Sequence, residues 1–171
     1  MARSSGPDNT ECDGSDDADQ DEHGHEGRRR IGGSLGVATA LDALRAEGVL
    51  VLASGSMTHN LALVFGAGRP PLDAPEVPQS AAFRSWFAER SAAADWPALL
   101  DYRAQAPHAA LMHPSDEHLL PWYVAAGAGH EGPALRVHDS LTYGCLGMDA
   151  YAFGTPAPAL QAALAATPAL H

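Results

Sequence analysis

Three histidines and one glutamate stand where side chains could bind a metal ion or transfer protons. His59 lies in the small, polar segment Ser-Gly-Ser-Met-Thr-His-Asn, residues 54–60. His113 and His118 stand at the two ends of His-Pro-Ser-Asp-Glu-His, with Glu117 beside the second. A neutral imidazole is a good metal ligand, and its pKa near neutrality also suits proton transfer. The candidate chemistry is therefore metal binding, acid–base catalysis or both.

The spacing of these residues limits how they can act together. His113 and His118 are five residues apart, so they do not share one helical face as the two histidines of an HExxH zinc motif do. We expect Ser115 to cap a helix, which puts His118 in its first turn and His113 before it. A single histidine also often serves structure, by hydrogen bonding or capping. The position of His59 favours function, because α/β sheets place ligands beyond the carboxyl ends of their strands.

Several elements must position these side chains. The apolar run over residues 49–53, Val-Leu-Val-Leu-Ala, predicts a strand that is covered on both faces in a parallel sheet. Before it, apolar residues at helical spacing predict a helix over about 34–47, which Gly48 ends in the left-handed conformation. After it, four prolines and two glycines predict a surface loop over 66–79.

The second half of the chain adds helices and closing strands. Aromatic residues predict an amphipathic helix around Phe83, and Asp95, as N-cap before a Trp-Pro pair, predicts another helix through about Gln105. The apolar run that follows His118 predicts a buried helix that ends near Gly127. Residues 134–153 alternate apolar and polar side chains, which predicts one or two strands.

The two ends of the chain differ from its centre. The first 30 residues contain nine Asp or Glu and four Arg with almost no apolar residue, so we expect 1–33 to be a disordered acidic tail. Residues 34–154 can bury a core and form the folded domain. The Ala-rich segment 155–171 is expected to be a tail or a short helix.

Composition excludes several functions. A formal net charge of -11 argues against nucleic acid and against a basic membrane-binding surface. Cys12 and Cys145 have no CxxC spacing, which argues against a disulfide framework or a thiolate zinc site. No apolar run approaches the roughly 18 residues of a membrane span, and no signal peptide is evident, so we expect a cytoplasmic protein. Neither a P-loop nor a GxSxG serine elbow is present.

Three segments in order resemble a known family. Residues 48–61, residues 113–121 and residues 141–153 resemble the carboxyl-terminal half of class III extradiol ring-cleavage dioxygenases, in the DOPA dioxygenase-like branch. The resemblance extends over 34–154. It implies an α/β fold in the form of a partial three-layer sandwich. A mainly parallel central sheet would be flanked by helices, with the amino-terminal half of the family fold missing.

The resemblance also implies a reaction. Family members use Fe(II), or sometimes hold Zn(II), and open a small aromatic diol of the catechol type with O2. Carried over by position, His59 and His113 would be catalytic, with His59 as the acid/base. His59, His118 and Glu117 would lie at the metal, in an open site that leaves room for substrate and O2.

An alternative follows from what is missing. The amino-terminal half of family members supplies two further metal-binding histidines, and nothing in this sequence matches them. The chain could therefore be a truncated dioxygenase. It could also be a non-catalytic remnant of the scaffold that binds metal weakly, acts through a partner or self-associates through an exposed sheet edge.

Overall fold

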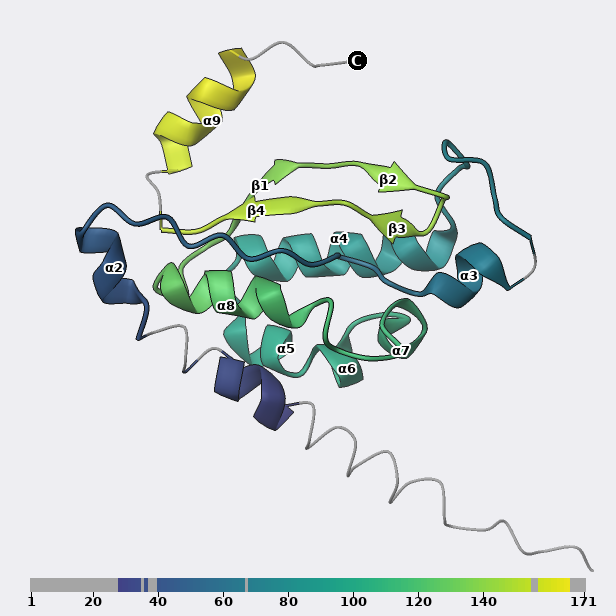
Figure 1. The fold of residues 1–171 in the computed structure, drawn as a ribbon, viewed down its shortest axis with the longest axis horizontal. Coiled ribbons are helices and arrows are strands. Elements are labelled where there is room, and N and C mark those ends of the chain that lie inside the picture. The colour runs from purple at the N-terminus through teal and green to yellow at the C-terminus, as the bar shows by residue number, and fades with distance from the viewer. Residues whose placement is uncertain (1–27, 35, 37–39, 67, 155–156, 167–171) are drawn as a thin grey trace, which may run out of the picture.

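The computed structural model describes residues 28–34, 36, 40–66, 68–154 and 157–166 (Figure 1). As expected, the chain is a mixed α/β structure. In chain order the described elements are α2 (Asp42–Ala46), α3 (Leu61–Phe65), α4 (Pro78–Ala92), α5 (Trp96–Leu100), α6 (Tyr102–Gln105), α7 (Ala109–Met112), α8 (Leu120–Ala128), β1 (Leu135–His138), β2 (Leu141–Thr142), β3 (Leu146–Gly147), β4 (Ala150–Ala152) and α9 (Ala157–Ala166). No helix in these ranges is long and apolar enough to cross a membrane.

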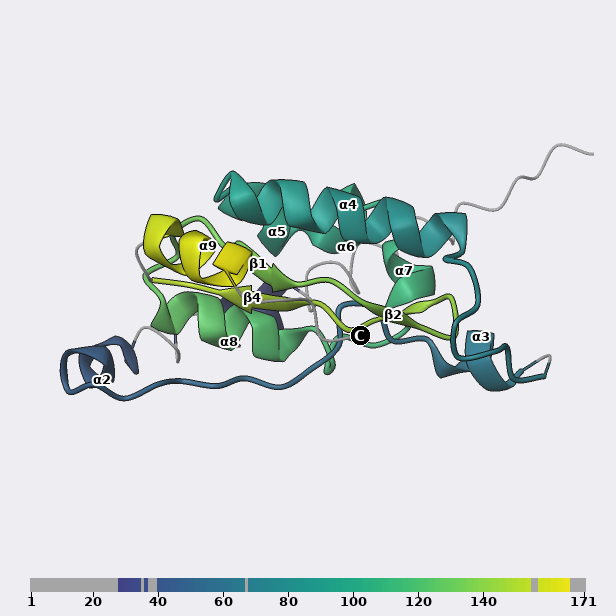
Figure 2. The same ribbon diagram turned by 90° about the horizontal axis from the view of Figure 1, so that it is seen from above.

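The strands form two small antiparallel sheets. β1 pairs with β4, with Leu135 opposite Ala152, and β2 pairs with β3, with Thr142 opposite Leu146. Connections this short allow antiparallel neighbours only. The mainly parallel central sheet of the predicted sandwich is therefore not seen among the described strands. Figure 2 shows the strands between α4 on one side and α8 on the other.

The core lies where α4, α5, α6, α7 and α8 meet. The predicted amphipathic helix is α4, which buries Phe83 and Phe87 completely. Phe87 meets Trp122 of α8 edge to face, with 4.8 Å between the ring centroids. Asp95 caps α5 as predicted, because its carboxylate accepts a hydrogen bond from the amide of Ala98 at 3.3 Å. The predicted single helix through Gln105 is divided into α5 and α6.

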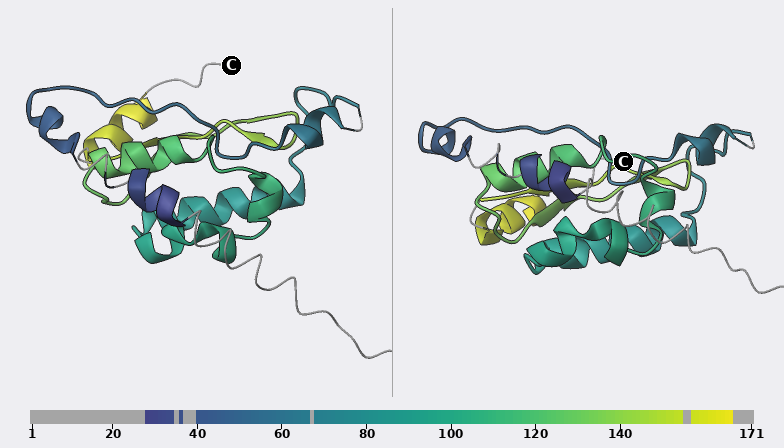
Figure 3. Two further views of the ribbon diagram at one scale, coloured as in Figure 1. Left: turned by 60° about the horizontal axis from the view of Figure 1, so that its bottom comes forward. Right: turned by 90° about the horizontal axis from the view of Figure 1, so that it is seen from below.

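The helix predicted over 34–47 is not continuous. Residues 28–34 are helical, a turn covers 40–41, and α2 follows. Ile31 is only 1% exposed, so packing begins inside the segment expected to be a tail, whereas residues 1–27 lie outside the described residues. Figure 3 shows the helical turn of 28–34 beside α8. Gly48 directly after α2 has a φ of 77°, as predicted for the end of a helix.

The strand predicted over residues 49–53 is wrong for the described structure. The segment runs extended between α2 and α3 (Figure 1), and the amides of 50–55 donate no hydrogen bond to a described residue. Exposure alternates as in a strand: Leu50 and Leu52 are 84% and 86% exposed, and Val51 between them is partly buried. The composition suits a strand, but a strand also needs a paired neighbour.

The predicted cap at Ser115 is also wrong. The hydroxyl of Ser115 donates to the carboxylate of Glu117 at 2.7 Å, and α8 begins only at Leu120. The buried carboxylate of Asp116 accepts hydrogen bonds from Tyr102 at 2.5 Å and from Arg103 at 2.8 Å. These bonds hold residues 114–119 as a series of bends and turns, and His118 consequently precedes the helix.

Candidate functional site

The turn that carries His59, residues 56–60, is tied to three distant segments of the chain. The amide of Ser56 donates to the carbonyl of His118 at 2.8 Å, and the amide of His59 donates to the carbonyl of Met112 at 2.9 Å. Between them, the amide of Met57 donates to the carbonyl of Gly147 at 3.1 Å. The backbone of this turn is therefore positioned by the end of α7, by the segment before α8 and by β3.

The rings of His59 and His118 lie face to face. Their centroids are 3.5 Å apart and their planes differ by 27°. The approach of the two segments requires glycine at Gly55, because a Cβ there would lie 2.3 Å from the carbonyl oxygen of His118. Two imidazoles that are 59 positions apart in the sequence thus meet at one place.

The surroundings of His59 favour its neutral ring. Burial, and then the neighbouring His118, lower the pKa of His59, although Glu117 acts in the opposite direction. The pKa of Glu117 is itself lowered, chiefly by the hydrogen bond from Ser115. Glu117 is fully exposed, so water screens its charge. A neutral His59 with a free lone pair can accept a proton or a metal ion.

His113 reaches the same turn from the core side. Its ring is fully buried, and Nε2 donates to the carbonyl of Met57 at 2.8 Å. Nδ1 has no hydrogen-bond partner among the described residues. Burial lowers the pKa of His113 to about 4, so this ring stays neutral near pH 7. As expected, the side chains of His113 and His118 point to different places, and His113 contacts the aromatic core at Phe83, 5.4 Å between centroids.

A cavity lies beside His118. It has a volume of about 280 Å³ and is bounded by residues 52–57, by α8 through Trp122 and Ala125, and by β4 through Tyr151. Pockets that bind small molecules begin at about 300 Å³, so this space lies at the lower end of that size range. Its lining combines aromatic residues with two serines and His118, and His59 is not among the lining residues.

The described residues do not complete a metal site. No group of three His, Cys, Asp or Glu side chains that could hold an ion occurs within the ranges that the structure describes. Open non-haem iron sites use three protein ligands, and His59 and His118 supply two imidazoles. Glu117 is the nearest carboxylate in the sequence, but it is turned to Ser115.

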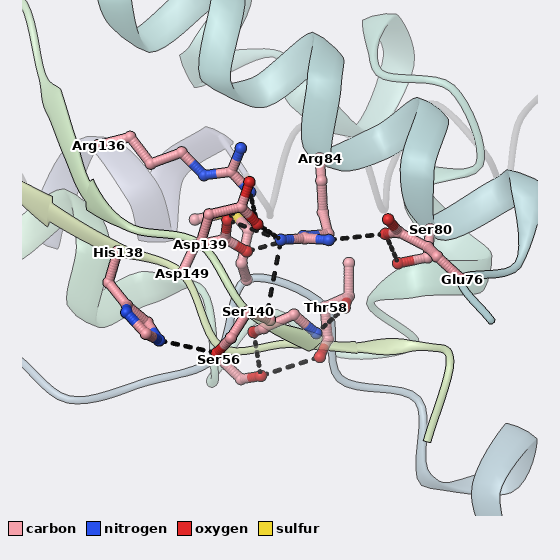
Figure 4. A network of polar contacts seen from close by, with 12 residues as sticks. Ser56, Thr58, Glu76, Ser80, Arg84, Arg136, His138, Asp139, Ser140 and Asp149 are labelled. Atoms are coloured by element: carbon pink, nitrogen blue, oxygen red, sulfur yellow. Dashed lines mark hydrogen bonds and ion pairs between the residues drawn. The ribbon is translucent and has the colours of Figure 1, made fainter. Parts of the chain in front are cut away.

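Sequence reasoning missed a partly buried ionic cluster next to this site (Figure 4). The guanidinium of Arg84 binds Asp149 at 2.8 and 2.9 Å, Glu76 at 2.8 Å and Asp139 at 2.5 Å. Arg136 binds Asp139 at 2.7 Å and also contacts Asp149. The carboxylate of Asp149 is completely buried, and the charged partners raise the pKa of Arg84 further despite burial. The sequence did contain a signal for this cluster, because Arg84 lies at helical spacing among the buried residues of α4.

Comparison with known proteins gives relatives for most of the chain. The family described as the catalytic LigB subunit of aromatic ring-opening dioxygenase matches residues 22–154. Proteins named 4,5-DOPA dioxygenase extradiol are similar: the one from Beta vulgaris is 36% identical over 115 residues, and the one from Portulaca grandiflora is 32% identical over 124 residues. These matches cover 67% and 68% of this chain but only 41% and 42% of the relatives.

A solved structure shares the fold. The uncharacterized protein JW3007 from Escherichia coli K12 superposes with a TM-score of 0.54 at 23% identity. The match covers 73% of this chain and 49% of that protein. The chain therefore spans less than half the length of these relatives and of this solved structure.

Proposed function

The chain belongs to the family of the catalytic LigB subunit of aromatic ring-opening dioxygenases, and from this premise we propose that it is the carboxyl-terminal part of an extradiol dioxygenase. The substrate class is a catechol-type aromatic diol, which is opened with O2. Residues 34–154 form the proposed part of the catalytic domain. The observation that carries the proposal is the contact of His59 with His118, which lines a cavity of about 280 Å³.

Each site residue has a proposed role. His59 accepts a proton from a hydroxyl of the diol and later returns one, for which its lowered pKa keeps the ring neutral. His118, at the cavity wall, and His59 are the proposed contacts to Fe(II) or Zn(II), with Glu117 as the neighbouring carboxylate. His113 is fully buried and holds the carbonyl of Met57, so its proposed contribution is to orient the His59 turn.

The metal itself is not accommodated by the described residues alone, because they offer two clustered imidazoles and no third ligand. Catalysis by the proposed reaction therefore requires at least one more ligand than these residues supply. A cytoplasmic location and the lack of a nucleic-acid partner stay predictions from composition.

Activity and metal content test this proposal together. The purified chain is loaded with Fe(II) under anaerobic conditions, and a catechol is added before air is admitted. We expect bound iron, which is lost in His59→Gln and retained in His138→Gln, a matched change at an exposed histidine. A yellow ring-opened product is expected only where a third ligand completes the site. No bound metal in the unaltered chain would refute the proposal.

A second candidate is favoured by the segment 50–55: a non-catalytic scaffold that acts through a protein partner. The amides of residues 50–55 donate no hydrogen bonds to described residues, and the apolar side chains of Leu50 and Leu52 are exposed. No charged residue interrupts positions 48–58. Natural sheet edges are normally protected by charges, prolines or bulges, and an unprotected edge pairs with other strands.

Hydrogen exchange together with the oligomeric state tests this second candidate. If an added strand covers the segment, the amides of 50–55 exchange slowly in the complex, and Leu52→Lys weakens association. Leu164→Lys, at an exposed leucine of α9, should leave association unchanged. Fast exchange of these amides in every complex that the chain forms would refute the candidate.

A further inference from the structure

We propose that Thr58 is the positioning residue of the His59–His118 pair, because its hydroxyl joins the His59 turn to the turn between β2 and β3. The inference deepens the proposed function, since it concerns the same two histidines. It rests on the geometry of the folded chain and needs neither metal nor substrate to be tested.

The hydroxyl of Thr58 uses both its donor and its acceptor. Thr58 is fully buried, and its Oγ1 donates to the carbonyl of Cys145 at 2.8 Å and accepts from the amide of Gly147 at 2.6 Å. The amide of Met57 adds a third bond, to the carbonyl of Gly147. Valine has nearly the same shape as threonine but would leave the backbone groups of Cys145 and Gly147 unpaired.

These two hydrogen bonds of the Thr58 hydroxyl form a clamp on residues 145–147, and that segment is itself held in place. A Cβ on Gly147 would lie 2.8 Å from Nε of Arg84, so glycine is required for the close approach of β3 to α4. Two residues further on, the buried Asp149 receives the bidentate hydrogen bonds of Arg84. Figure 4 shows Thr58 and Ser56 beneath this cluster. The long helix α4 thus anchors the strand segment to which Thr58 binds.

Thr58 acts on the ring of His59 because the two residues are adjacent. The His118 side of the pair is attached through the bond between Ser56 and the carbonyl of His118. His59 has its own amide bond to Met112, and the preceding residue, Thr58, ties the turn to residues 145–147 through its hydroxyl. Without the hydroxyl, the turn can rotate relative to His118, and the stacked arrangement of the rings is lost.

Histidine ring signals in NMR spectra distinguish positioning from mere stability. Rings that stack at 3.5 Å shift each other's carbon-bound protons and give cross-relaxation between the rings. We expect Thr58→Val to abolish the contact between the His59 and His118 rings and Thr58→Ser to retain it. Ser80→Ala, which removes another buried hydroxyl of the same polar network, should retain it as well. The signals are assigned with His59→Gln and His118→Gln.

Two results would overturn the inference: an unchanged ring contact in folded Thr58→Val, or equal loss of the contact in Thr58→Val and Thr58→Ser. If Thr58→Val does not fold, Thr58→Ala replaces it, because that change also removes the hydroxyl that binds Cys145 and Gly147. That variant should shift the ring signals, and unshifted signals would again overturn the inference. Loss of dioxygenase activity alone has no bearing on these readouts, so the two proposals fail separately.

Discussion

His113 should make the folded chain lose stability as the pH falls from 7 to 5. Its ring is fully buried and Nδ1 has no partner in the described part of the chain, so a second ring proton would place a charge in the core. Burial lowers the pKa to about 4 in the folded chain, from an ordinary value of 6.5 that the unfolded chain retains. Below pH 6.5 the unfolded chain takes up a proton that the folded chain does not, and stability falls until the pH reaches about 4.

The size of the effect follows from these two pKa values. Each pKa unit corresponds to about 1.4 kcal/mol, so the full loss is about 3 kcal/mol, of which about 2 kcal/mol falls between pH 7 and pH 5. Urea unfolding at pH 7, 6 and 5 measures it for the chain and for His113→Gln, which keeps an N–H for the carbonyl of Met57 but does not titrate. The difference in pH dependence between the two proteins then measures the contribution of His113. An equal pH dependence of the two would refute the reasoning.

Three further changes test the packing, each by urea or thermal unfolding. Gly129→Ala should lower the free energy of unfolding by about 1–3 kcal/mol, because its Cβ would lie 2.2 Å from Cβ of Phe153. Gly132→Ala, where a Cβ would meet no atom within 4 Å, should change it by no more than about 0.5 kcal/mol. Equal effects of the two changes would contradict this. Asp95→Ala should cost about 1 kcal/mol through the lost cap of α5, and Asp95→Asn much less, so an equal loss in both would argue against capping. Arg84→Met should cost about 3–5 kcal/mol because Asp149 stays buried with fewer partners, and a neutral result would contradict a stabilising role.

Local signals in the sequence predicted those elements whose causes are themselves local. The cap at Asp95 and the left-handed Gly48 each depend on a few neighbouring residues, and both occur as expected. The stripe of aromatic residues on α4 is also local, because helical periodicity alone places Phe83 and Phe87 on one face.

Tertiary contacts overrode the local signals elsewhere. Ser115 has the sequence context of a cap, but Asp116 is drawn to Tyr102 and Arg103, and the helix starts later. The composition of 49–53 suits a central strand, but no described segment pairs with it. Neither outcome is encoded within a short window of sequence.

The candidate site was predictable only in part. Position and resemblance singled out His59 and His118, and the structure brings their rings together, while their roles stay predictions. The clamp of Thr58 could not be read from the sequence, because its partners lie 87 and 89 positions away. Arg84 was detectable in principle, as a charged residue on a buried helical stripe.

The long separation of Thr58 from Cys145 also affects how the chain is made. During synthesis both site histidines are added to the chain before residues 145–147. Until then the His59 turn has only its contacts to the segment 112–118, whereas the closing contact to Cys145 spans 87 positions and waits for the later residues. A nascent chain arrested just after residue 130 would therefore contain both imidazoles without the hydroxyl clamp that sets the spacing between them.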